Sequence, residues 1–406
     1  MSWLNLGLLL MLIAGHAEVW VALINRLHAN PISPDLLQRL RHIHDLLIPG
    51  FALAVLVCLG LTGPRLLFGG AWSEVGWGWF PFLIASAGGV VGGLYGIARF
   101  QGTRSCPIQV GEKSQVSVIR HPDGSLPVAR GPFERMARLP FNEQPTVDLN
   151  RKLFAHPGLP QEFSGLRILH LSDWHLEGTI TREYFEQVTQ IAAREIVDLV
   201  VFTGDLLDQQ ACLEWLPTTL GQFSAPLGCW FILGNHDWYL DADEARRRLE
   251  GMGWKDATSS IQSVAYRGGQ LLIAGDETPW MRQAPAFPKR PERQPNAAPE
   301  FRILLSHTPD NIERARQQGV DLMLSGHTHG GQVVLPLIGP VYSPSRFGCR
   351  FAGGAFWQTP TLLHVSRGLS GRHPLRWRCR PEVSVLEFVT PGELTNPVPV
   401  AIPLPA

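Results

Sequence analysis

Side chains that bind divalent cations stand in several short stretches in the second half of the chain. They offer carboxylate oxygens, an amide oxygen and imidazole nitrogens, which are ligands for many metals. The candidate ligands are Asp173, His175, Asp205, Asn235, His307, His327 and His329. These side chains are enough to hold two cations side by side. Two cations roughly 3.5–4 Å apart are the usual apparatus for in-line attack on a phosphoryl group.

The stretches that precede these ligands indicate buried strands. Residues 166–172 form a mostly apolar run directly before Asp173, and residues 198–203 lead into Gly204 and Asp205. Three similar runs cover residues 229–233, 301–305 and 321–325. Continuous apolar runs bounded by turn residues are typical of a sheet covered on both faces. Because ligands at the carboxyl ends of such strands meet at one edge, the pattern predicts an α/β fold with a site there.

Helix signals lie between the predicted strands. Thr181 could cap a helix over residues 182–197, and Asp243 could open a helix over residues 244–250. Asp310 could open a third helix over residues 311–318, with Gly319 as its C-terminal stop. We therefore expect helices to alternate with strands in this half of the chain.

The order of these motifs resembles the calcineurin-like metallophosphoesterases, including a bacterial membrane-associated branch of phosphodiesterases and UDP-2,3-diacylglucosamine pyrophosphatases. The matching motifs, in order, are Asp173-x-His175, Gly204-Asp205-x-x-Asp208, Gly234-Asn235-His236-Asp237, His307 and Gly326-His327-Thr328-His329. One of these motifs alone would be weak, but five in order, each at a strand end, are specific. The resemblance covers residues 159–388 and implies a sandwich of two sheets flanked by helices.

The resemblance also implies a role for each side chain. Asp173, His175 and His329 would hold one ion, Asn235, His307 and His327 a second, and Asp205 would bridge both. A hydroxide between the ions would be the nucleophile, because metal binding lowers the pKa of water to roughly 7. His236 and Asp237 are the predicted catalytic pair: His236 would stabilise the phosphoryl group or protonate the leaving oxygen, while Asp237 orients its ring. Asp208 is interpreted as a supporting carboxylate rather than a ligand.

The expected cofactors are two divalent cations. We expect Mn²⁺, with Fe or Zn as alternatives, since Asp, Asn and His ligands suit several of these metals. Other side chains have two interpretations. Trp174 and Trp238 either pack or line a substrate groove, and His170 is interpreted as structural. Five arginines either clamp a phosphate or lie on a solvated face: Arg346, Arg350, Arg372, Arg376 and Arg378.

The first hundred residues have a different composition, with three apolar stretches. Residues 3–24, 46–67 and 75–98 are each long enough to cross a bilayer, which predicts an α-helical transmembrane region of about three spans over residues 1–100. Residues 34–47 indicate either an amphipathic helix on the membrane surface or a polar lead-in to the second span. The third stretch carries a tandem GxxxG pattern, which favours close helix contact and suggests an oligomer.

Basic residues give an expected orientation. Arg26, Arg39 and Arg41 follow the first span, and Arg99, Arg104 and Lys113 follow the third. The positive-inside rule then places the amino terminus outside and the catalytic domain in the cytoplasm, in a multi-pass protein of the inner membrane. The net charge is zero and charged residues make up 17%, so binding to nucleic acid through bulk charge is not expected.

The remaining boundaries follow from composition. Residues 101–160 form a basic connector with strand-like pieces, either resting on anionic lipid or serving as an ordinary linker. Residues 161–390 form the metallophosphoesterase domain, in which residues 281–300 are a flexible insertion. Residues 391–406 are a Pro-rich tail. The six cysteines show no CxxC pair and indicate no disulfide framework.

These observations together predict a membrane-anchored phosphoesterase with two metals, acting on a phosphodiester or pyrophosphate. Its expected partners are membrane lipids and a phosphorylated, lipid-linked small molecule, such as the UDP-diacylglucosamine substrate that the resemblance implies. Two alternatives remain at this point. One is a phosphodiesterase or phosphatase of broad specificity for soluble substrates, and the other is a metal-binding scaffold of the same fold without turnover.

Overall fold

The computed structural model describes residues 1–103, 105–129, 131, 133–290 and 298–395. The chain divides into two compact units. The helical unit contains Met1–Thr103 and Leu335–Arg350, and the sheet unit contains Arg104–Val334 and Phe351–Ala406.

A seven-stranded sheet holds the first three groups of predicted ligands. Its strand order is β1-β2-β15-β3-β4-β5-β6. Strands β3, β4, β5 and β6 are parallel, whereas β15 runs antiparallel to β3 and parallel to β2. The strands are β1 (Gln109–Val118), β2 (Thr146–Ala155), β3 (Leu166–Leu171), β4 (Leu199–Thr203), β5 (Cys229–Ile232), β6 (Trp254–Asp256) and β15 (Glu382–Val389).

A six-stranded sheet holds the remaining ligands, with the order β13-β14-β10-β9-β8-β7. Its strands β8, β9, β10 and β14 are parallel. The strands are β7 (Gln262–Tyr266), β8 (Gly269–Asp276), β9 (Glu300–Ser306), β10 (Leu322–Ser325), β13 (Gly354–Gln358) and β14 (Thr361–Val365), and a separate two-stranded ribbon contains β11 (Val334–Leu335) and β12 (Gly339–Pro340). The predicted strands that precede the ligands are therefore confirmed.

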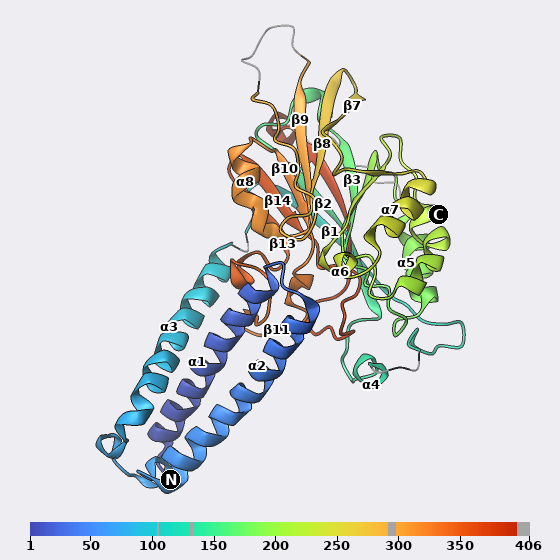
Figure 1. The fold of residues 1–406 in the computed structure, drawn as a ribbon. Helices are drawn as coiled ribbons and strands as arrows, with labels where there is room; N and C mark the ends of the chain where they lie inside the picture. The colour runs from blue at the N-terminus through green and yellow to red at the C-terminus, as the bar shows by residue number, and fades with distance from the viewer. Residues whose placement is uncertain (104, 130, 132, 291–297, 396–406) are drawn as a thin grey trace. The chain divides into compact units, whose positions relative to one another are not determined.

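Hydrophobic packing explains why these strands are apolar on both faces. Side chains from both sheets, such as Ile168 and Ile303, form one buried cluster between the sheets. Leu169 points the other way and joins a second cluster, which includes Phe185 of α5 and Leu249 of α7. Successive residues of a strand point to opposite faces, so a sheet covered on both sides needs an apolar residue at each position. Figure 1 shows α5 and α7 beside the larger sheet.

The predicted helices form, with shifted ends. Helix α5 (Arg182–Ala192) starts where predicted and is shorter, and α8 is limited to Ile312–Gln317. Helix α7 (Ala242–Gly251) is capped by Asp241, whose side chain accepts a hydrogen bond from Glu244 N at 2.9 Å, and not by the predicted Asp243. Two further short helices are α4 (Glu134–Ala137) and α6 (Asn235–Trp238).

The segment predicted as a connector is part of the sheet unit. Strand β2 pairs with β15 inside the larger sheet, and β1 forms its edge. The boundary predicted at residue 161 is therefore wrong, since the unit begins before β1. The physical reason is that β1 is an edge strand with mostly exposed, polar side chains, and such a strand lacks the apolar signal of a buried one.

The first half of the insertion predicted as flexible, at residues 281–300, contacts the rest of the sheet unit. Phe287 is buried, and its backbone N–H donates to Gln318 Oε1 at 3.0 Å. Arg290 donates to Gly319 O at 3.0 Å and pairs with Asp321. A composition rich in Pro and Arg gives no sign of these contacts in the sequence. Residues 291–297 lie outside the described residues, as do residues 396–406 of the predicted tail.

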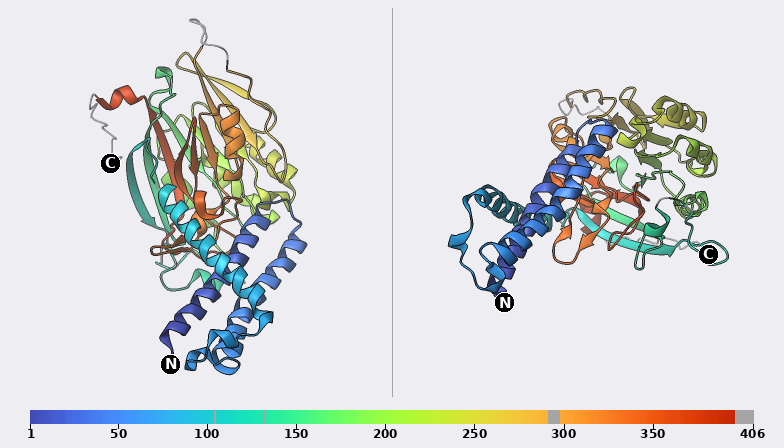
Figure 2. Two further views of the ribbon diagram at one scale, coloured as in Figure 1. Left: turned by 90° about the vertical axis from the view of Figure 1, so that its left-hand side faces the viewer. Right: turned by 60° about the horizontal axis from the view of Figure 1, so that its bottom comes forward.

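The helical unit contains three helices that are long and apolar enough to cross a membrane. They are α1 (Trp3–His28), α2 (Pro34–Ala54) with its continuation Val55–Thr62, and α3 (Phe80–Thr103), whose candidate span starts at Trp77. Figure 2 shows them side by side from two further directions. Residues 34–47 belong to the same continuous helix as the second span, so they are its polar lead-in rather than a separate surface helix.

Part of the glycine pattern in α3 serves contact within the chain. A Cβ atom on Gly89 would lie 2.0 Å from Gly15 O, and one on Gly15 would lie 2.0 Å from Ser86 O. Only glycine allows α1 and α3 to approach this closely. Among the described residues, a Cβ on Gly88, Gly92 or Gly96 would meet no atom within 4 Å. Self-association through that outer face stays a prediction.

Candidate metal centre

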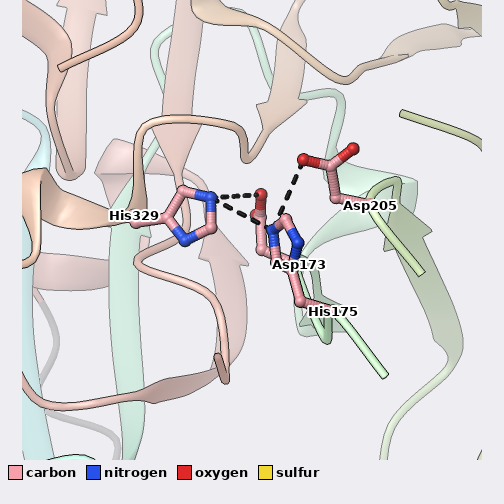
Figure 3. Close-up of side chains that lie close together, drawn as sticks. All are labelled: Asp173, His175, Asp205 and His329. Atoms are coloured by element: carbon pink, nitrogen blue, oxygen red, sulfur yellow. Dashed lines mark hydrogen bonds and ion pairs between the residues drawn. The ribbon is translucent and has the colours of Figure 1, made fainter. Parts of the chain in front are cut away.

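All seven predicted ligands lie together at the carboxyl ends of strands from both sheets, in two adjoining groups. One group contains Asp173, His175, Asp205 and His329, and the other contains Asp205, His307 and His327. Within each group, one ligand atom per residue lies within 4.8 Å of the others. Asn235 joins the second group, because its Oδ1 lies 3.0 Å from His307 Nε2. Figure 3 shows the first group, in which the side chains point toward one another.

Three imidazoles of the site share one orientation. His307 Nδ1 lies 2.8 Å from Thr203 O, and His329 Nδ1 lies 2.9 Å from Ser370 O. His175 Nδ1 lies 3.2 Å from Asp208 Oδ2. Because each of these acceptors takes the Nδ1 proton, we assign the lone pair to Nε2. A metal-binding histidine is usually held in this way through its other nitrogen.

The Nε2 atoms point at the carboxylates of the site. His175 Nε2 lies 3.4 Å from Asp205 Oδ2, and His307 Nε2 lies 3.3 Å from Asp205 Oδ1. The shared residue Asp205 thus offers one oxygen to each group. His329 Nε2 lies 3.5 Å from Asp173 Oδ1. The gaps between these ligand atoms are where cations would lie.

The two carboxylates provide a test of whether this donor set fits a cation. Asp173 and Asp205 are almost completely buried, and among the described residues their Oδ2 atoms have no hydrogen-bond partner. Burial raises the pKa of Asp173, whereas for Asp205 the effect of burial is outweighed by His307, His236 and His175, which hold its pKa well below the usual range. An unpartnered buried carboxylate oxygen is costly, and a divalent cation is the partner that it lacks. The residues present therefore fit metal ions.

The backbone that carries the ligands is strained. Five of them have positive φ angles: Asp173 (52°), His175 (46°), Asp205 (54°), His327 (70°) and His329 (53°). A residue with a side chain pays roughly 1–2 kcal/mol in this left-handed region. Such strain persists where the surroundings enforce it and gathers at functional sites. Here it turns the chain sharply at the strand ends and aims successive side chains at the same point.

Glycines in the motifs make room for the carboxylates. A Cβ atom on Gly234 would lie 2.2 Å from Asp205 Oδ1, and one on Gly326 would lie 2.1 Å from Asp173 Oδ2. No other residue type avoids these clashes. The glycines before Asn235 and His327 are therefore required by close packing of the site itself.

The contacts of His236 correct one sequence-based prediction. Its backbone N–H donates to Asp205 Oδ1 at 2.9 Å, and its ring Nδ1 contacts the carboxylate of Asp208. Asp237, predicted to orient this ring, instead accepts hydrogen bonds from the backbone N–H groups of Gly234 (2.8 Å) and Leu207 (2.9 Å). Asp237 stands in the first turn of α6, which directs its side chain back onto the loop backbone. Asp208 therefore orients His236.

Charge explains the protonation of this pair. Burial alone would lower the pKa of His236, but the carboxylates of Asp208 and Asp205 raise it to about 10. Burial would likewise raise the pKa of Asp208, but His236 and His175 hold it far below its usual value. Burial raises the pKa of Asp237 to about 6. His236 and Asp208 thus form a tight imidazolium–carboxylate pair at the rim of the site.

Sequence reasoning misjudged the role of Arg376 and missed Trp280. Arg376 is fully buried and donates to His329 O at 3.0 Å and to Ser370 O at 2.5 Å, so it is neither a phosphate clamp nor a solvated arginine. Trp280 lies beside the second group, with its ring centroid 4.9 Å from that of His327. Neither residue stands in a recognisable motif. Trp174 is fully buried in the core beneath the site, as the packing interpretation expects.

A buried polar network lies behind the metal centre. His170 Nδ1 lies 2.9 Å from His364 Nδ1, and its Nε2 lies 2.9 Å from Thr203 Oγ1. Lys152 Nζ lies 3.0 Å from His364 Nε2 and 3.2 Å from Glu382 Oε1. All of these side chains are buried. The network links β2, β3, β4, β14 and β15, which agrees with the structural interpretation of His170.

The sequence of this chain is similar to those of known phosphoesterases. A profile of the calcineurin-like phosphoesterase family matches residues 166–331. The metallophosphoesterase YkuE of Bacillus subtilis is 32% identical over 233 residues, which cover 56% of this chain and 80% of YkuE. The phosphodiesterase YaeI of Escherichia coli is 28% identical over 228 residues (55% and 82%). The UDP-2,3-diacylglucosamine pyrophosphatase LpxG of Chlamydia muridarum is 26% identical over 289 residues (56% and 86%).

Proposed function

This chain belongs to the calcineurin-like metallophosphoesterases, and from that premise we propose that it is a membrane-anchored hydrolase with two metal ions, acting on a lipid-linked phosphodiester or pyrophosphate. The observation that carries the proposal is the position of Asp205. Its two oxygens face different groups of ligands, 3.4 Å from His175 Nε2 and 3.3 Å from His307 Nε2. A carboxylate shared in this way suits two cations held side by side.

The ligand assignment follows from the two groups. Asp173, His175 and His329 would hold one ion, Asn235, His307 and His327 the other, and Asp205 both. Bound divalent cations would lower the pKa of water and offset the negative charge of a phosphoryl group. We propose Mn²⁺, with Fe or Zn as alternatives, because the same ligand types serve all three.

The chain itself supplies a proton donor. Asp208 holds Nδ1 of His236, which leaves Nε2 of that ring to donate to a phosphoryl oxygen or to the leaving oxygen. The backbone N–H of His236 also donates to Asp205, so one residue both steadies the shared carboxylate and contributes a proton. Arg376 and Thr203 keep the neighbouring ligand loops in place through the backbone oxygen of His329 and the ring of His307.

The choice of substrate rests on the anchor and on the names of relatives. Three candidate spans in the same chain favour a substrate that resides in the bilayer. LpxG is a UDP-2,3-diacylglucosamine pyrophosphatase, and the proposed substrate is a lipid-linked diphosphate of that type. YaeI is a phosphodiesterase, which favours a phosphodiester on a soluble compound as the second candidate. From the basic residues after the first and third spans, we further propose that the sheet unit faces the cytoplasm at the inner membrane.

A hydrolysis screen on the detergent-solubilised full chain tests this function. The chain, loaded with Mn²⁺, Fe²⁺ or Zn²⁺, is given UDP-diacylglucosamine, bis-p-nitrophenyl phosphate and p-nitrophenyl phosphate, with Asp205→Asn as the matched inactive control. We expect metal-dependent cleavage, with the lipid nucleotide turned over best. Cleavage of the soluble diester alone would favour a soluble phosphodiester over the lipid nucleotide as the substrate. Failure to cleave any of the three compounds with metal bound would overturn the proposal.

The orientation has a separate test. Ser260 is an exposed serine of the sheet unit, so a cysteine placed there is accessible on whichever side of the membrane the unit lies. We expect an impermeant maleimide to label Ser260→Cys only after the cells are opened. Labelling of intact cells would place the sheet unit outside.

A further inference from the structure

One stretch downstream of the metal-binding loop belongs to the helical unit. Leu335–Arg350 follows His329 in the chain by a few residues, yet it forms one compact unit with Met1–Thr103. Within that unit it makes specific contacts. Gln101 Nε2 donates to Leu337 O at 2.8 Å, and Ser343 N donates to Asn25 Oδ1 at 3.1 Å. The contact to Asn25 is buried.

Further contacts show which turns of α1 and α3 the stretch lies against. Gly339, with φ 95°, lies on the ring of Phe100, where a Cβ atom would come within 2.5 Å of Cε1. The rings of Tyr342 and His28 meet edge to face with centroids 5.9 Å apart. Phe100 and Gln101 stand in the last turn of α3, and Asn25 and His28 in the last turn of α1. The stretch therefore crosses from the end of one candidate span to the end of another.

The tip of this stretch carries apolar side chains that nothing in the helical unit covers. Leu337 is 91% exposed, Ile338 43% and Val341 37%. Leu337 also has a positive φ of 67°, an uncommon conformation for a branched residue, which turns its side chain out. Exposed apolar groups that gather at one place mark a contact surface.

We propose that residues 335–341, here called the membrane loop, insert Leu337 and Ile338 into the interfacial layer of the bilayer that α1 and α3 span. The bilayer is the occupant that fits, because the stretch Leu335–Arg350, which contains the loop, is hydrogen-bonded to the last turns of two candidate spans through Leu337 and Ser343, and the interface of a membrane lies at such turns. Exposed Arg26 and Arg99 stand in or next to the same turns and suit anionic headgroups. The segment that contacts lipid would then follow His327 and His329 in the chain by only a few residues.

Depth measurement on the full chain in nanodiscs tests the membrane loop. Leu337→Cys, in a background with Cys58→Ser and Cys349→Ser, is labelled with an environment-sensitive nitrobenzoxadiazole dye and reconstituted with phosphatidylglycerol-containing lipid. The matched control is Ile196→Cys, an aliphatic residue of the sheet unit that is 76% exposed. At position 337 we expect quenching by doxyl-labelled lipid and protection from iodide. The control should show the reverse.

Two outcomes would overturn the proposal. Iodide quenching at position 337 equal to that at position 196 would mean that the loop lies in water. Protection from iodide without quenching by doxyl lipid would mean that a protein surface, including a second copy of this chain, covers it. Because Leu337 is almost fully exposed, its substitution leaves the fold intact, and unchanged metal content of the labelled chain verifies this. The result does not depend on which substrate the enzyme hydrolyses.

Discussion

Two imidazoles of the candidate metal centre, His175 and His307, are as buried as His170 and His364 of the polar network behind it, yet the two pairs make different contacts. His175 and His307 give Nδ1 to an acceptor and turn Nε2 toward carboxylates. The ring nitrogens of His170 instead contact His364 and Thr203, neither of which is a candidate ligand. His170 and His364 also lie within regular strands, whereas His175, His327 and His329 have left-handed backbones. Burial alone therefore does not distinguish the candidate ligands from the structural histidines, whereas the contact of Nε2 with other candidate ligands does.

Asp205→Asn should have the largest effect on the metal-centre side of this comparison. The variant keeps the size of the side chain but replaces one carboxylate oxygen by an NH2 group. The side chain then has one oxygen left and no longer offers an oxygen to each group of ligands. We expect hydrolysis to fall by about 10³-fold or more. Metal content by mass spectrometry and turnover are measured together, and full metal-dependent activity would remove Asp205 from its bridging position.

His236→Ala and Asp208→Asn should separate catalysis from metal binding. Removing the proton donor or its orienting carboxylate should lower kcat by roughly 10²–10⁴-fold. Metal content should stay near normal in His236→Ala, and loss of metal there would instead make His236 a ligand. Asp237→Asn is the matched control, since its carboxylate accepts from backbone N–H groups. We expect Asp237→Asn to lower the melting temperature and to leave kcat nearly unchanged at temperatures where the variant is folded.

Glu382→Gln should damage the network without touching the metals. Glu382 pairs with Lys152 and Arg367 and accepts from Ser384 Oγ at 2.6 Å; Glu382, Lys152 and Ser384 are buried, and Arg367 is half-buried. Leaving buried cations without their partner costs roughly 3–5 kcal/mol of folding free energy. Denaturant unfolding of the sheet unit, followed by tryptophan fluorescence, measures the loss. If the variant unfolded like the wild type and released its metals, the network would be part of the metal centre instead.

A buried imidazole outside both of these regions, His156, should make stability depend on pH. Its Nε2 lies 3.2 Å from Asp321 O, and its Nδ1 accepts from Gly158 N at 3.1 Å, so the ring is neutral. Burial, with a smaller effect from Arg290, lowers its pKa to about 4. The unfolded chain, with a pKa of about 6.5, binds more protons between these values, so stability present above pH 6.5 is lost as the pH falls toward 4.

The size of this effect is set by the pKa difference, up to roughly 3 kcal/mol. His156→Gln removes the titrating group, and the difference in unfolding free energy between wild type and variant should shrink from pH 7 to pH 4. A difference that stays constant across this range would show that folding does not lower the pKa of His156.

Much of the candidate metal centre could be predicted from the sequence, because its candidate ligands follow directly on apolar strands. A ligand at a strand end occupies a position fixed by the sheet, so Asp173, Asp205 and His307 converge without further information. The three candidate spans were equally readable, since crossing a bilayer needs a long apolar helix. The close contact of Gly15 with Gly89 gives part of the glycine pattern its physical meaning.

The rest depends on contacts between distant residues. Both Asp208 and Asp237 stand near His236 in the motifs, and only the turn of α6 decides which carboxylate reaches the ring. Arg376 is buried by a loop whose path no local pattern specifies. Strand β1 has three valines among ten residues and no buried position, so its place at the sheet edge is visible only through its pairing with β2.

The position of β15 has a consequence for how the enzyme is made. This strand, Glu382–Val389, lies between β2 and β3, although more than two hundred residues separate it from either in the chain. A ribosome therefore delivers every metal ligand before it delivers the strand that closes the sheet. Until then β2 and β3 each present an unpaired edge, so the nascent sheet unit waits half-assembled while its anchor is already complete.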